Sequence, residues 1–238
     1  MAPVVGTIAK WRQARMFHPV GQTYAAEFAA AVPWAERLGR SVIVRTSGAL
    51  SKTERERFEV LGIALRFHRG HKLTTKVVDT DQDLLLATIA SPFTMGLSPF
   101  TTNAHDFLAN RYYAVSPFEI ASERTLASSA AEGRRGLIAD GRFELRLTPQ
   151  VHGVVEGTRA ERFAAAVAAG QAVFALEAKK TLTWKWQTVG TLKVTKPLDL
   201  DQDALRFDPF HAGAGLQPVG VVHAMRRATY AISRKLGR

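Results

Sequence analysis

The sequence predicts an α+β fold: an antiparallel β-barrel of about eight strands with peripheral helices and a helix near the C-terminal end. Short strand-like segments recur in both halves of the chain, and the helical patterns between them lack the regular alternation of a parallel doubly wound sheet. The composition, 46% hydrophobic and 22% charged, is ordinary for a globular protein with a sizeable core. We expect residues 1–238 to form a single domain.

The first half begins with an alanine-rich stretch, Ala25–Leu38, in which Pro33 interrupts any helix. β-Branched and aliphatic residues then predict three strands, at Ser41–Thr46, Leu61–Phe67 and Asp83–Ile89. Arg66, at a strand centre, fits a solvated barrel exterior as well as a functional group, and His68 is expected in a polar loop. Prolines from residue 91 to about 124 indicate loops and short helices.

The second half returns to strand patterns. Apolar residues alternate along Gly141–Thr148, which predicts a half-buried strand. Arg159–Ala169 is alanine-rich with apolar residues at helical spacing, and a last helix is expected from about Val219 to Lys235. Three further segments have strand-like composition: Ala172–Ala178, Leu182–Gln187 and Val189–Thr195.

The net charge of +11 favours anionic partners, but the basic residues are scattered and no nucleic-acid-binding signature is present. No specific nucleic acid is therefore expected. The absence of cysteine excludes disulfides, iron–sulfur clusters and a thiolate haem ligand. No secretory signal and no run of 18 apolar residues are visible, so we expect a cytoplasmic protein without a transmembrane segment.

One pair of residues near the C-terminal end has haem-binding chemistry. Residues four apart on a helix share a face, so Arg226 would lie beside the hydroxyl of Tyr230. A ferric ion and a guanidinium both favour the phenolate, and tyrosine is an established proximal haem ligand. A buried aromatic residue on an amphipathic helix explains the same pattern, so both interpretations stay open.

Six short motifs follow one another along the chain: Arg15-Met-Phe-His18-Pro-Val-Gly21, Val44-Arg-Thr-Ser47, Gly62-Ile-Ala-Leu-Arg-Phe67, Asp83-Leu84, Phe207-Asp-Pro209 and Arg226-Arg-Ala-Thr-Tyr230. In content and order they resemble the motifs of the haem catalases. The resemblance spans almost the whole sequence but only part of a full catalase. The chain is similar to the small catalase-related proteins that consist of the barrel core only.

The resemblance implies that Tyr230 is the axial iron ligand of haem b and that Arg226 is its charge partner. His18 would be the distal base that moves the peroxide proton, and Ser47 would orient it by a hydrogen bond. The residues implied to pair with the haem propionates are Arg15, Arg45 and, as a weaker candidate, Arg234. His18 alone fits a structural histidine equally well.

One departure from the family concerns the distal asparagine, whose position corresponds here to Ala87 and Thr88. Unless Thr88 replaces that amide, fast dismutation of hydrogen peroxide is weakened. Peroxidase chemistry, with an unidentified electron donor, or conversion of organic hydroperoxides is then expected. The arm that ties catalase tetramers together has no counterpart, so a homo-oligomer is left open.

Two other functions stay open. The first is a catalytically inactive catalase-fold module that binds a hydrophobic ligand. The second is a basic barrel that binds nucleic acid or an anionic membrane surface.

Overall fold

The computed structural model describes residues 21–49, 56–70, 72–91, 94–114, 116–120, 142–151, 156–202 and 204–219. Its ten strands belong to one antiparallel sheet. The strands are β1 (Gly21–Ala30), β2 (Ser41–Gly48), β3 (Leu61–His68), β4 (Gln82–Ala87), β5 (Tyr112–Ala114), β6 (Phe118–Ile120), β7 (Phe143–Pro149), β8 (Val173–Lys180), β9 (Gln187–Pro197) and β10 (Leu216–Pro218).

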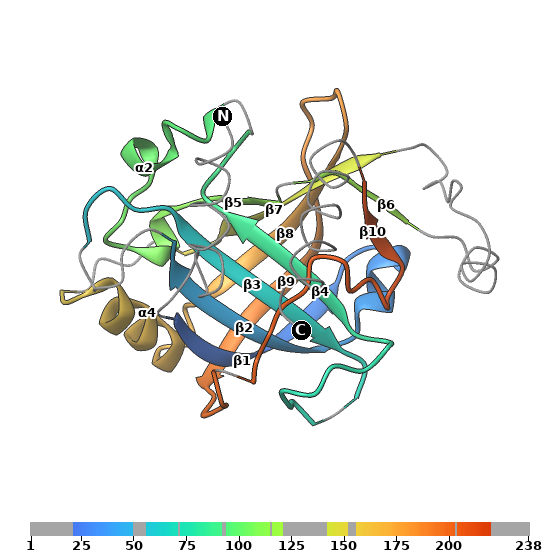
Figure 1. The fold of residues 1–238 in the computed structure, drawn as a ribbon, viewed down its shortest axis with the longest axis horizontal. Coiled ribbons are helices and arrows are strands. Elements are labelled where there is room, and N and C mark those ends of the chain that lie inside the picture. The colour runs from blue at the N-terminus through green and yellow to red at the C-terminus, as the bar shows by residue number, and fades with distance from the viewer. Residues whose placement is uncertain are drawn as a thin grey trace, which may run out of the picture.

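Eight of these strands close into a barrel (Figure 1). β1, β2, β3, β4, β5, β7, β8 and β9 pair in sequence order, and β9 returns to pair with β1. β5 and β6 pair with successive parts of the same edge of β7, and β10 extends β6. The expectation of an antiparallel barrel is thereby confirmed.

Alternate residues of each strand fill the barrel with side chains. Phe28 and Phe67 meet edge to face inside it, with 5.2 Å between ring centroids. An eight-stranded barrel is just wide enough for such a packed interior. The strands supply the inward-facing residues Tyr24, Ala26, Val42, Val44, Leu61, Ile63, Leu65, Leu84, Leu86, Leu145, Leu147, Leu176, Leu192 and Val194.

The described helices are short and lie around the barrel (Figure 1). They are the 3-10 helices η1 (Pro33–Leu38) and η3 (Phe107–Ala109) and the α-helices α2 (Ser98–Thr101) and α4 (Arg159–Ala168). Thr158 begins α4 with a capping box that includes Glu161. Phe163 of α4 then packs edge to face on Tyr24 of β1, so this helix covers the barrel near the start of β1.

One expectation for the elements was wrong, and one strand was not predicted. Leu182–Gln187 is largely the loop between β8 and β9, and Leu182 has a positive φ of 69° that no strand contains. The alanine-rich stretch begins as strand β1, because β2 and β9 on either side supply pairing that outweighs a low β-propensity. The predicted C-terminal helix falls, apart from Val219, outside the described residues.

Candidate functional site

The outer face of β1–β4 holds two of the residues that the resemblance singles out. Val42 and Val44 of β2 point into the barrel, so Arg45 and Ser47 point outwards, on one face. Both are nevertheless buried, with exposures of 8% and 5%. This part of the barrel wall is therefore covered rather than solvated.

The strand register surrounds Ser47 with small residues. Ser47 pairs with Gly21 on one side and Gly62 on the other, and Gly62 pairs with Ala87. None of these three neighbours has a side chain larger than a methyl group. The row of Arg45 contains Thr23, Ala64 and Leu85.

The Arg45 side chain is held by hydrogen bonds and packs against the start of β1. Its Nε donates a hydrogen bond of 3.2 Å to Oε1 of Gln202, and Gln202 in turn donates one of 2.7 Å to the hydroxyl of Thr23. A Cβ atom on Gly21 would stand 2.7 Å from Cζ of Arg45. The guanidinium therefore lies directly on the Gly21 backbone, and the Thr46 carbonyl oxygen, also 2.7 Å from that Cβ position, leaves no room for a larger residue.

Thr88 lies one position beyond β4. Its hydroxyl oxygen accepts a hydrogen bond of 3.1 Å from the Leu61 backbone N–H and lies 2.7 Å from the Thr102 hydroxyl. The residue of β4 in the Ser47 row is Ala87. Thr88 thus ties β3 to the segment after α2, and its catalytic part stays a prediction.

The remaining predicted site residues are His18, Arg15, Arg226, Tyr230 and Arg234, and all five lie outside the described residues. The distance between the proposed iron ligand and the proposed base therefore stays untested. Within the described part of the chain, only Arg45 and Ser47 are brought together on one face.

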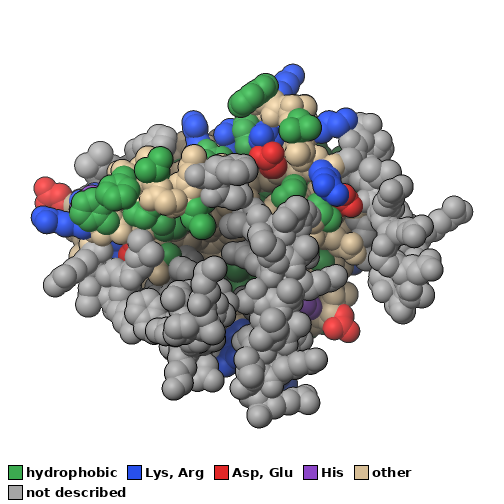
Figure 2. All heavy atoms as spheres, turned by 45° about the horizontal axis from the view of Figure 1, so that its top comes forward, with side chains coloured by type: hydrophobic (Ala, Val, Ile, Leu, Met, Phe, Trp, Pro, Cys, Tyr) green, Lys and Arg blue, Asp and Glu red, His purple; other side chains and the backbone are tan. Residues whose placement is uncertain are grey.

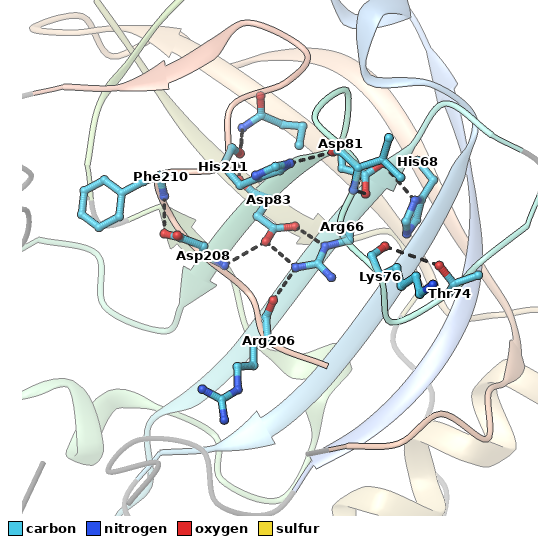
Figure 3. A network of polar contacts seen from close by, with 12 residues as sticks. Arg66, His68, Thr74, Lys76, Asp81, Asp83, Arg206, Asp208, Phe210 and His211 are labelled. Carbon is cyan, nitrogen blue, oxygen red and sulfur yellow. Dashed lines mark hydrogen bonds and ion pairs between the residues drawn. The ribbon is translucent and has the colours of Figure 1, made fainter. Parts of the chain in front are cut away.

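The next row of the same outer face contains a buried ion pair (Figure 3). Arg66 of β3 donates from Nε and Nη2 to the two carboxylate oxygens of Asp83 on β4, each at 2.8 Å. Both side chains are 0% exposed. Arg66 does not lie on a solvated exterior, because the segment after residue 204 covers it.

That covering segment is bound to the pair through its backbone (Figure 3). The Asp208 N–H donates to Asp83 Oδ2 at 2.8 Å, the Arg206 carbonyl accepts from Arg66 Nη2, and the Phe207 ring lies 5.0 Å from Arg66 Cζ. Nη1 of Arg66 has no hydrogen-bond partner in the described residues. Burial raises the pKa of Asp83, whereas the bonds from Arg66 and Asp208 lower it.

His68 ends β3 beside this network rather than lying in a loop as expected. Its Nδ1 is 3.0 Å from Oδ1 of Asp81, and the ring is buried. Burial lowers the pKa of His68 although Asp81 opposes the shift. Asp81 and the burial of Arg66 were missed from the sequence, because the only local signal was a charged residue inside an apolar strand.

Three of the catalase-like motifs meet in this network. Arg66 belongs to the Gly62–Phe67 motif, Asp83 begins the Asp-Leu motif, and the Phe-Asp-Pro motif is the covering segment Phe207–Pro209. These motifs are separated by up to about 140 residues, yet their side chains and backbones touch.

Comparison with known proteins adds no family. A scan against protein-family models and a search of curated proteins both found no match. In the described ranges, no group of three histidine, aspartate or glutamate side chains is arranged to hold a metal ion. No helix among those residues is both long and apolar enough to cross a bilayer.

Proposed function

We propose that this protein is a haem-dependent peroxidase or catalase-like enzyme of the cytoplasm that acts on hydrogen peroxide or organic hydroperoxides. The strongest support for this proposal is that three of the motifs are in contact. From the sequence alone, only their order along the chain was known. Asp83 contacts both Arg66 and Asp208, on the same outer face as Arg45 and Ser47. If the motif matches were accidental, there would be no reason for these motifs to contact one another in the fold.

The described residues fit part of a haem site. Haem is flat and has two anionic propionates. The Ser47 row presents only Gly21, Gly62 and Ala87 beside the serine, which suits the close approach of a flat ring. Arg45 is a buried cation two residues away, which suits a propionate. The proposed iron ligand and base lie outside the described residues.

When bound, haem would supply the iron at which peroxide reacts. Tyr230 would bind it through the phenolate oxygen, and Arg226 would stabilise that anion. His18 would accept a proton from the peroxide and return it to the leaving oxygen, while Ser47 would hold the imidazole in place. Arg45 would neutralise a propionate.

An absorption spectrum of the purified protein tests the proposal. We expect a Soret band that Tyr230→Phe abolishes or shifts and that Tyr113→Phe leaves unchanged. Tyr113 is a suitable control because it is a partly buried tyrosine of β5 beside Trp186. Stopped-flow mixing with hydrogen peroxide should give slow oxygen release, because Ala87 and Thr88 stand where catalases have asparagine.

Two results would contradict the proposal. A colourless protein that does not bind added hemin would favour the inactive module for a hydrophobic ligand. A Soret band that survives in Tyr230→Phe with unchanged shape would remove the proposed iron ligand. Oxygen release as fast as that of a true catalase would contradict only the expected loss of dismutation.

A further inference from the structure

The hairpin between β8 and β9 projects from the barrel at the top of Figure 1. Its loop carries two uncovered apolar side chains. Leu182 and Trp184 are each 95% exposed, more than any other large hydrophobic residue in the described ranges. Exposing a large apolar side chain to water forgoes most of its contribution to folding. The stability of the folded chain therefore does not explain why these two exposed positions are apolar.

The backbone at Leu182 makes its identity more unusual. The Thr183 N–H donates to the Lys180 carbonyl at 3.0 Å, so residues 180–183 form a tight turn. Leu182 occupies the third position of that turn with φ of 69°, a conformation that favours glycine or asparagine. A leucine there is strained and gains no contact that offsets the strain. Strain of this kind is found at functional positions.

Basic residues flank the two apolar residues along the chain. Lys180 and Lys185 are exposed, and neither forms an ion pair with any described residue. Lys179 pairs with Glu144 at 3.0 Å. Figure 2 shows hydrophobic and basic side chains side by side at the upper edge of the molecule, where this hairpin projects.

The base of the hairpin is held by stacking. The Trp186 ring lies 4.2 Å from Cζ of Arg146 and 5.3 Å from Nζ of Lys179, and it meets the Tyr113 ring edge to face. Arg146 is itself bound to Glu177 at 2.7 Å. The tip is thus presented on a fixed base, which reduces the entropy lost when it binds.

We propose that the hairpin tip docks on an anionic lipid bilayer. Leu182 and Trp184 enter the interface between headgroups and acyl chains, while Lys180 and Lys185 contact the lipid phosphates. Tryptophan prefers this interface, and each lysine near an anionic membrane adds about 1 kcal/mol. A nucleic acid fits less well, because leucine has no aromatic face on which a base stacks.

Co-sedimentation with vesicles tests this proposal and is independent of haem. The full chain should bind vesicles of phosphatidylcholine and phosphatidylserine at a molar ratio of about 7:3 and should not bind pure phosphatidylcholine. Leu182→Gly and Trp184→Ala should each weaken binding about tenfold, and Lys180→Gln or Lys185→Gln about fivefold. Leu97→Ala, a change at another exposed apolar residue (63%), should leave binding unchanged.

Brominated phosphatidylcholine in the same vesicles should quench the tryptophan emission of the wild-type protein. Trp184→Phe should keep binding and lose most of that quenching. Leu182→Gly should leave the melting temperature unchanged or raise it, because the glycine relieves the positive φ. The proposal is overturned if the anionic vesicles do not bind, or if Leu182→Gly combined with Trp184→Ala binds them like wild type. Loss of single-stranded DNA binding in that double variant, with vesicle binding intact, would also overturn it.

Discussion

Replacing Asp83 by asparagine should be among the most destabilising single changes in this barrel. The carboxylate accepts three hydrogen bonds of 2.8 Å, two from Arg66 and one from the Asp208 N–H, at a position with 0% exposure. Asp83→Asn leaves the Arg66 charge buried and unpaired, which costs about 3–5 kcal/mol. For a chain of this length, that cost lowers the melting temperature by roughly 6–20 °C.

A matched control is available on the surface. Arg142 and Glu119 form a pair at 3.0 Å in which the arginine is 57% exposed. Glu119→Gln should cost less than about 1 kcal/mol, because solvent screens that pair. Urea unfolding followed by circular dichroism gives the free energy of unfolding for both variants. If Asp83→Asn costs no more than Glu119→Gln, the buried pair does not stabilise the fold as argued.

A double substitution separates charge from packing. Arg66→Met with Asp83→Leu removes both charges and keeps apolar volume, so most of the stability lost in Asp83→Asn should return. The Asp208 N–H loses its acceptor in this double variant, because leucine has no oxygen, whereas the amide oxygen of Asp83→Asn can still accept. Its hydrogen exchange should therefore be faster in the double variant even where global stability has recovered. Slow exchange there would show that Asp83 does not hold the covering segment.

Two further outcomes concern single positions. His68 has a lowered pKa in the fold, so below about pH 6.5 the unfolded chain takes up a proton that the native state resists, and the free energy of unfolding falls. His68→Gln should remove part of this fall between about pH 7.5 and pH 5 in urea titrations, and an identical fall would contradict the assignment. A Cβ atom on Gly190 would stand 2.2 Å from Cζ of Phe28, so Gly190→Ala should cost about 1–3 kcal/mol in the same assay. Gly96→Ala meets nothing within 4 Å and should be close to neutral; equal losses would refute the steric argument.

Much of the barrel could be predicted because its strands are locally distinctive. The β-branched run at Ser41–Thr46 lies inside β2. The alternating apolar residues predicted up to Thr148 lie inside β7. β1 was missed because alanine has no strand preference of its own, and only pairing with β2 and β9 makes this segment extended. The loop after Lys180 was wrongly predicted to be a strand. Its tryptophans and threonines have high β-propensity, and residue type alone does not tell whether a segment lies in a sheet or in solvent.

The candidate site was predictable only in part. The two-residue spacing of Arg45 and Ser47 puts them on one face of any strand. The burial of Arg66 was not predictable, because the residues that cover it come about 140 positions later in the chain. A charged residue in an apolar strand is the same local pattern whether solvent or another segment faces it.

Closure of the barrel depends on the pairing of β1 with β9, which joins Tyr24 to Pro197. The intervening residues take about 10–30 s to synthesise on a ribosome. Throughout that time the emerging sheet has two open edges, each able to pair with a strand of another chain. Synthesis is thus the period when this protein is most prone to aggregation, and chaperone demand should fall once β9 has emerged.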